Sequence, residues 1–238
     1  MYEQAATSDC AGVVAAEAPA ADRMQFIRQT YAHLGGAIIL FMLLELRLLN
    51  SELGMTMVRA MRSTRWSWLL ILGGFVLVGN LAERFARSDR SVALQYAGLS
   101  LYVVAEAVIF LPLLTIARAV AGPDVIPTAM LITGIMFAGL TTAVFVSREN
   151  FNWLRGALTI GSMAGLGTIV CSILFGFSLG TLFSAAMVLL ACGYILYYTS
   201  KVLHEFRIGS HVAAALALFA AVMLLFWYVV RILMSRRR

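Results

Sequence analysis

One acidic residue stands inside a long apolar stretch and is the first candidate for chemistry. Glu106 lies near the middle of the apolar run 94–120. A carboxyl group is costly in hydrocarbon, so such residues face the bundle interior or water and mark ion or proton paths. Pro112 removes a backbone donor on the same run and can leave a carbonyl free near Glu106. Two interpretations follow: a polar pocket on an ion path, or a protonated acid that hydrogen-bonds to a neighbouring helix.

Glu45 and Arg47, a few residues from the end of another run, can reach the interface by snorkelling, and we interpret them as structural.

Patterns typical of enzymes occur in the chain, but their positions do not favour catalysis. Segment 176–180 matches G-x-S-x-G, yet that nucleophile pattern works at a sharp strand-to-helix turn, and here it links two apolar runs. The histidines His33, His204 and His211 fall near the ends of runs, not at the matched depth that a buried metal site needs. Lys201 is also near a run end, which excludes a deep retinal Schiff base. We therefore expect no enzymatic activity, no cofactor and no metal site.

The composition predicts the environment that positions these residues. The chain of 238 residues is 61% hydrophobic and 13% charged, and its mean hydropathy is +0.88. Such a chain has too little polar surface to form a water-soluble globule. In hydrocarbon every backbone amide must be paired, so the chain spans as helices or as a closed barrel, and barrels need short alternating segments. Because the apolar runs here are continuous, we expect an all-α polytopic membrane protein.

Seven runs are long enough to cross a hydrocarbon core about 30 Å thick at about 1.5 Å per residue. We expect spans at residues 31–49, 66–81, 94–120, 125–146, 154–175, 181–203 and 212–234. The expected domains are a disordered amino-terminal tail (1–25), a seven-helix transmembrane domain (26–235) and a basic carboxyl-terminal tail (236–238). The link 51–65 is either a short basic amphipathic helix on the lipid surface or a solvated loop.

The charge pattern indicates lipid as the partner on both sides. The net charge is +6, and the 18 basic residues divide evenly between the two expected faces, so the positive-inside rule does not choose an orientation. Contact with anionic lipid explains the charge. No basic stripe interleaved with aromatic residues lies in a soluble domain, so we exclude a nucleic-acid partner.

Small residues recur every four positions and predict close helix packing. The stripes are Ala213, Ala217 and Ala221 on the seventh run, Gly134 and Ala138 on the fourth, and Gly161 with Gly165 on the fifth. The first stripe makes the last helix a candidate for the centre of the bundle.

Several segments together match a known pattern. They are residues 26–36 (FIRQTYAHLGG), Glu106, 126–128 (IPT), 144–151 (VFVSRENF) and 195–200 (ILYYTS). From residue 26 to residue 233 the chain resembles the Bax inhibitor-1 family. The resemblance implies seven helices with the last one central and an amino terminus in the cytosol. It also implies calcium leak across membranes, survival under stress and, in bacteria, control of a membrane-anchored AAA protease.

The chain departs from this family at a pair of aspartates that share a proton and close the pore. The sixth-helix acid falls at Tyr198, and the seventh-helix acid at Ala221, or at Ala217 if the alignment slips one turn. None of these side chains ionises near neutral pH, so the resemblance supports the fold and Glu106 but not a pH-gated leak. Tyr198 either donates a hydrogen bond to an acid such as Glu106 or is an interfacial aromatic. Arg231 is either a basic latch like the family's or an interfacial arginine.

Two functions remain open. In the first, a calcium or other cation leak passes through a polar pocket around Glu106. In the second, the protein does not conduct and regulates a membrane protease or another membrane protein. The intramembrane acid favours the first, which we take as the working hypothesis, and the missing aspartates favour the second. The Ala- and Arg-rich composition with few lysines indicates a bacterial inner membrane.

Overall fold

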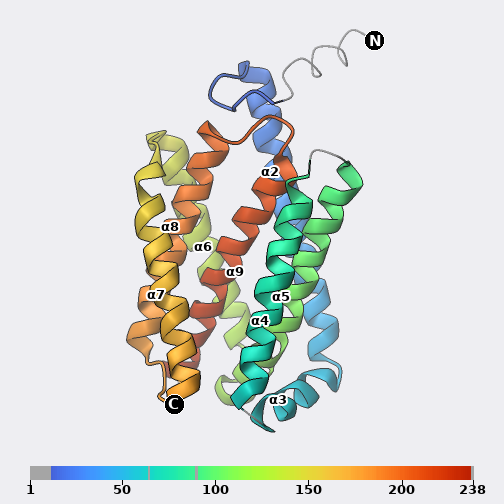
Figure 1. Ribbon diagram of the computed structural model, residues 1–238, viewed down its shortest axis with the longest axis vertical. Coiled ribbons are helices and arrows are strands. Elements are labelled where there is room, and N and C mark those ends of the chain that lie inside the picture. Colours follow the sequence, from blue (N-terminus) through green and yellow to red (C-terminus); the bar gives the residue numbers. More distant parts are fainter. Residues whose placement is uncertain (1–11, 64, 89–90, 237–238) are drawn as a thin grey trace.

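The protein is a bundle of α-helices (Figure 1). The computed structural model describes residues 12–63, 65–88 and 91–236. Over these residues it contains no sheet, only an isolated bridge between Val14 and Arg207. The elements are α2 (Ala20–Leu49), α3 (Leu53–Ser63), α4 (Arg65–Ala86), α5 (Val92–Ala121), α6 (Val125–Ser147), a 3-10 turn η1 (Phe151–Trp153), α7 (Leu154–Phe175), α8 (Thr181–His204) and α9 (His211–Arg236). The predicted all-α class is confirmed.

In the described part of the chain, 7 helices are long and apolar enough to cross a membrane, namely all except α3. They coincide with the seven expected spans, and α7 has the expected bounds. The largest difference is at α2, which begins at Ala20 rather than at residue 31. Residues 20–30 include Asp22, Arg23 and Arg28, which lower the hydropathy, but most of this stretch is made of good helix formers. The helix therefore extends beyond its apolar part.

The amino-terminal segment corrects the expectation of a disordered tail through residue 25. The Ala15 amide donates to the Phe206 carbonyl at 2.9 Å, and the Ile208 amide donates to the Val13 carbonyl at 2.9 Å. Ala15 is fully buried, so small apolar side chains allow this segment to pair with the loop between α8 and α9. Residues 1–11 of the expected tail lie outside the described residues. At the other end α9 includes Arg236, and the rest of the expected basic tail lies outside the described part as well.

The link between the first two spans contains a short helix, α3, which is one of the two structures that we expected for residues 51–65; the other was a solvated loop. Helix α3 packs against α5, with Gly54 close to Thr115 and Leu111. This contact places α3 across the end of the bundle where α9 ends (Figure 1). We call that end the carboxyl-terminal face, and the end where α2 begins the amino-terminal face.

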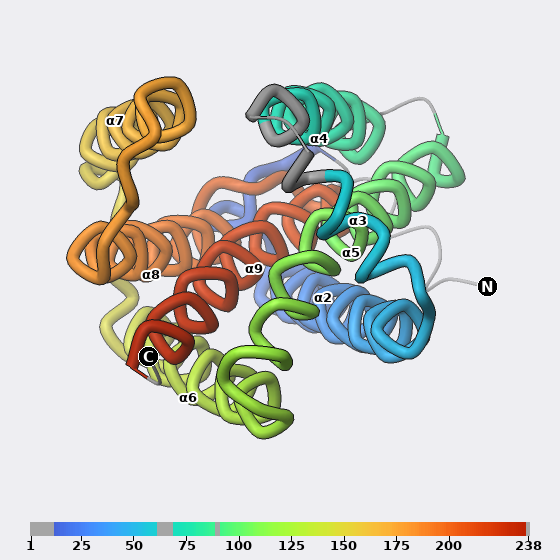
Figure 2. The backbone as a smooth tube through the Cα atoms, turned by 90° about the horizontal axis from the view of Figure 1, so that it is seen from below, coloured from blue at the N-terminus to red at the C-terminus, as the bar shows by residue number. Residues whose placement is uncertain are grey.

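Helix α9 lies at the centre of the bundle, as predicted. Figure 2 shows it between α2, α5, α6 and α8. In an apolar stretch of 18 residues, 83% of the residues of α9 are buried. The corresponding share is 56% for α5 and no more than 28% for any other described span. Aromatic rings fill the contact with the neighbouring helices: Phe41 packs edge-on to Phe110, Phe219 and Phe226 at centroid distances of 5.2, 6.2 and 6.4 Å.

The small-residue stripes have different roles. Ala213, Ala217 and Ala221 are buried along α9. A Cβ on Gly161 would lie 2.7 Å from Leu190, and one on Gly165 would lie 2.9 Å from the Met187 sulfur, so these glycines bring α7 close to α8.

The stripe on α6 does not pack within the chain, which corrects that expectation. Gly134 and Ala138 are exposed, and nothing lies within 4 Å of a Cβ built on Gly134. The buried face of α6 instead carries Ala129, Thr133 and Val144. A shift of one residue turns a helix face by about 100°. Spacing alone therefore reveals a stripe but not the direction that it faces.

Candidate functional site

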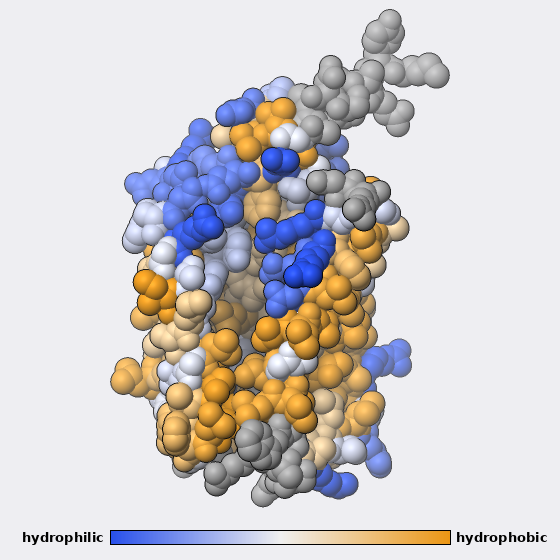
Figure 3. All heavy atoms as spheres, in the orientation of Figure 1, coloured by the Kyte–Doolittle hydropathy of each residue, from blue (hydrophilic) through white to orange (hydrophobic). Residues whose placement is uncertain are grey.

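A cavity of about 880 Å³ opens among the helices and gathers most of the predicted site residues. Glu106, Tyr198, Ala221 and Arg231 all line it, whereas Ala217 does not. Its walls come from α4, α5, α7, α8, α9 and the link between α7 and α8, and most of them are apolar. Figure 3 shows the corresponding face of the molecule hollowed at its centre, with hydrophilic side chains on the rim toward the amino-terminal face.

The cavity occupies the half of the bundle nearer the carboxyl-terminal face. On α5 its lining extends from Tyr102 to Ile116, and on α9 from Ala220 to Arg231. The link residues that line it, 177–179, lie on the carboxyl-terminal face. Among the lining residues of α5 and α8, Tyr102 and Tyr198 lie closest to the amino-terminal face. We call this side of the cavity its inner end. The lining therefore extends from the α7–α8 link to two tyrosines, Tyr102 and Tyr198.

Glu106 reaches the inner part of this cavity without a counter-ion. The residue is 5% exposed, and the Tyr102 side chain, one turn earlier on α5, lies close to its carboxyl group. The ion pairs found among the described residues are Arg87–Glu83 and Lys201–Glu205, both outside the cavity lining. In the same part of the chain no three His, Cys, Asp or Glu side chains cluster as metal ligands. Glu106 is thus a single buried acid at the end of a mostly apolar cavity.

Tyr198 is an internal residue of this site. Its ring stacks on that of Tyr194 at 5.7 Å and 16°, and the Tyr194 hydroxyl pairs with that of Ser162 at 2.7 Å. Of the two tyrosines, Tyr102 rather than Tyr198 is the one that acts on the Glu106 carboxyl group. Sequence reasoning missed Tyr102, although its i, i+4 spacing from Glu106 places the two side chains on one helix face.

Arg231 stands at the carboxyl-terminal end of the cavity. Its Nη2 donates to the Leu179 carbonyl at 3.5 Å, and its guanidinium carbon lies 6.0 Å from the centre of the Tyr228 ring. The side chain therefore contacts the α7–α8 link from the last helix. Close by, the Thr181 and Ser235 hydroxyls pair at 2.7 Å and hold the same two elements together.

Glu45 corrects the interpretation that it snorkels to the interface. It is 4% exposed, and neither carboxyl oxygen has a hydrogen-bond partner in the described structure. Leu34, Ala37, Phe41 and Glu45 form the buried stripe of α2, so the acid continues a face that packs into the core. Its spacing of four residues from Phe41 is the signal that could have predicted this burial.

Replacing Glu45 by methionine is expected to raise the free energy of unfolding by about 1 to 2 kcal/mol, because unpaired buried oxygens are exchanged for an apolar chain of similar size. Equilibrium unfolding in mixed detergent micelles measures the difference. The same change at the exposed Glu52 serves as the control and is expected to shift stability by less than about 0.5 kcal/mol. A less stable Glu45→Met protein would contradict the prediction and indicate that Glu45 has a stabilising partner.

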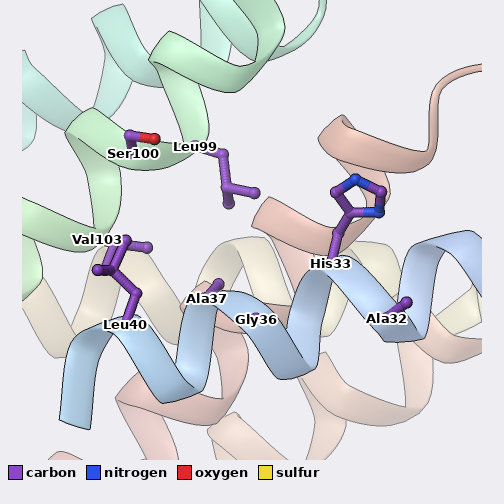
Figure 4. Close-up of a pocket in the computed structure, with 8 residues that line it drawn as sticks. All are labelled: Ala32, His33, Gly36, Ala37, Leu40, Leu99, Ser100 and Val103. Carbon is purple, nitrogen blue, oxygen red and sulfur yellow. The ribbon is translucent and has the colours of Figure 1, made fainter. Parts of the chain in front are cut away.

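A second pocket of about 370 Å³ lies between α2 and α5 (Figure 4). His33 lines it near the amino-terminal face, together with small residues such as Gly36 and Ser100. The His33 Nε2 pairs with the Tyr96 hydroxyl at 2.8 Å, and its ring lies 4.8 Å from that of His211. These contacts join α2, α5 and the start of α9. Its lining contains no acidic residue, which makes it a poorer candidate for cation binding than the larger cavity.

Comparison with known proteins agrees with this architecture. A family model described as inhibitor of apoptosis-promoting Bax1 matches residues 23–238, which includes the whole of the cavity. Over 106 residues, 44% of this chain, the sequence is 32% identical to the uncharacterized protein PA2604 of Pseudomonas aeruginosa, and the match covers 47% of that relative. With the family model matching nearly the full length, the chain belongs to the Bax inhibitor-1 family.

Proposed function

We propose that the protein is a slow cation leak pathway, with calcium as the ion, and that Glu106 is its internal cation site. The observation that carries this proposal is a cavity leading from the carboxyl-terminal face to a buried carboxyl group without a counter-ion. A buried acid facing a cavity is the usual mark of an ion path in a membrane. Calcium leak is also the activity that family resemblance implies.

The same cavity accounts for a slow rate and a closed resting state. A cation entering from the carboxyl-terminal face passes Arg231, whose positive charge opposes it. At the inner end Tyr102 and Tyr198 separate Glu106 from the amino-terminal face. The charged groups acting on Tyr198 from beyond this barrier are Glu83 and Arg87, an exposed ion pair on α4. Movement of the tyrosines would join the two halves of the path.

The alternative function is a regulator that conducts nothing. By family resemblance the two aspartates fall at Tyr198 and at Ala221 or Ala217, none of which carries a carboxyl group here. The cavity is also mostly apolar, and both features favour this alternative. In that case the partner is a membrane-anchored protease or another membrane protein involved in stress survival. For either function we propose a bacterial inner membrane and a cytosolic amino terminus, which reporter fusions at the two termini would test.

Calcium flux into liposomes holding the purified protein tests the conducting function. Flux above that of empty liposomes is expected for the wild type, and Glu106→Gln is expected to lower it about fivefold because the neutral amide attracts a cation less strongly. Glu52→Gln removes an exposed acid and is the matched control, with flux equal to the wild type. Wild-type flux no higher than that of empty liposomes would reject the leak and favour the regulator. Equal flux in wild type and Glu106→Gln would reject Glu106 as the cation site.

A further inference from the structure

The carboxyl-terminal part of the cavity has a property that cation conduction does not require. Arg231 places a positive charge at its mouth, and no acidic side chain pairs with this charge among the described residues. The contacts of the guanidinium are a single carbonyl at 3.5 Å and the face of the Tyr228 ring. A partly buried arginine with spare donors is suited to bind a carboxylate through two parallel hydrogen bonds.

The walls beyond Arg231 are apolar. Leu113, Ile173, Leu224 and Trp227, from α5, α7 and α9, line the space between the arginine and Glu106. A volume of about 880 Å³ falls within the usual range for small-molecule pockets, which are mostly apolar with a few polar groups that set the orientation. Glu106, at the inner end, repels a second negative charge. A ligand with one anionic head and an apolar tail therefore fits in one direction only.

We propose that this cavity binds an anionic single-chain amphiphile of the fatty-acid class, with its carboxylate on Arg231 and its chain directed toward Glu106. Charge complementarity at the mouth selects the head, and the apolar walls accept the chain. A bound amphiphile fills the space through which a cation would reach Glu106, so it also acts as a blocker of the proposed leak. The binding itself does not depend on conduction, and it can be measured without an ion gradient.

Trp227 supplies a reporter inside the site. It lines the cavity, and its ring lies 5.0 Å from that of Phe110, edge-on. In a protein whose other three tryptophans, Trp66, Trp68 and Trp153, are replaced by phenylalanine, fluorescence comes from Trp227 alone. Dibromostearic acid quenches tryptophan on contact, and its methyl ester has the same chain without the charge. Titrating each into the protein in detergent micelles compares binding of the head with partition of the chain.

Saturable quenching by the acid is expected, with an apparent affinity at least about tenfold higher than that of the ester. Arg231→Gln is expected to remove this preference, and Arg231→Lys to retain much of it. Arg236→Gln, which removes an exposed charge from the last turn of the same helix, is the matched control and leaves the preference unchanged. If Arg231→Gln does not fold, the comparison of the acid with its ester in the protein that keeps Arg231 still tests the proposal.

Three outcomes would overturn the proposal. Equal quenching by acid and ester would show simple partition of the chain. An undiminished preference for the acid in Arg231→Gln would place the head elsewhere. Displacement of the dibromostearic acid by unbrominated phosphatidylglycerol, at an affinity equal to that of the acid, would assign the site to phospholipid. None of these results affects the calcium flux measurement, so the leak and the amphiphile site succeed or fail separately.

Discussion

Replacing Tyr198 by alanine is expected to raise the calcium flux of the reconstituted protein by more than about tenfold, because it removes the aromatic ring that closes the inner end of the cavity. The ring lines the cavity near Tyr102, and it stacks on Tyr194 at 5.7 Å. An alanine leaves this space empty and extends the cavity toward the amino-terminal face. Flux into liposomes, measured at constant protein density, gives the ratio of the two rates.

Tyr198→Phe is the matched control for this gain. It keeps the ring and its stacking and removes the hydroxyl, so flux is expected to stay close to the wild type. A large rise in Tyr198→Phe would show that the hydroxyl, rather than the bulk of the ring, holds the path closed. No rise in Tyr198→Ala would mean that the barrier lies elsewhere and that Tyr198 is not the gate of the proposed path.

Most of the fold could be predicted from the sequence because the bilayer limits the possible structures. A run such as 154–175 has to be helical to pair its amides in lipid, and α7 has those bounds. The start of α2 was not predictable in this way. Beyond the lipid a helix continues for as long as propensity and packing allow, and hydropathy does not report either.

The sequence predicted several residues of the candidate site, but it did not predict how these residues contact one another. Glu106 was found because an acid in an apolar run is conspicuous, and the family pattern pointed to Tyr198 and Ala221. That they share one cavity with Arg231 depends on the rotation of three helices, α5, α8 and α9, about their axes, which the sequence specifies only weakly. Glu45 shows the same limit, since its distance from the helix end suggested the interface while its rotation placed it in the core.

The position of Glu106 itself depends on a contact between α4 and α5. Gly98 is buried against α4, where a Cβ would lie 2.6 Å from the Ala82 carbonyl oxygen and 2.7 Å from the Ala86 amide nitrogen. Both atoms belong to the backbone and cannot rotate away. Tyr102 and Glu106 follow Gly98 by one and two turns of the same helix, so the close approach at Gly98 sets the place of the cavity's inner end.

Gly98→Ala is therefore expected to lower the free energy of unfolding by about 3 kcal/mol, because the added methyl group forces two helix backbones apart. Gly134→Ala provides the matched control, since nothing lies within 4 Å of the added Cβ and alanine is the better helix former. It is expected to raise stability by up to about 1 kcal/mol. Unfolding of both variants in mixed detergent micelles, followed by circular dichroism, measures the difference.

If Gly98→Ala proved as stable as Gly134→Ala, α5 would have room to shift, and the contact with α4 at Gly98 would not hold Tyr102 and Glu106 in place. A loss of stability confined to Gly98→Ala would show that this contact holds α5, the helix that carries Glu106, tightly against α4.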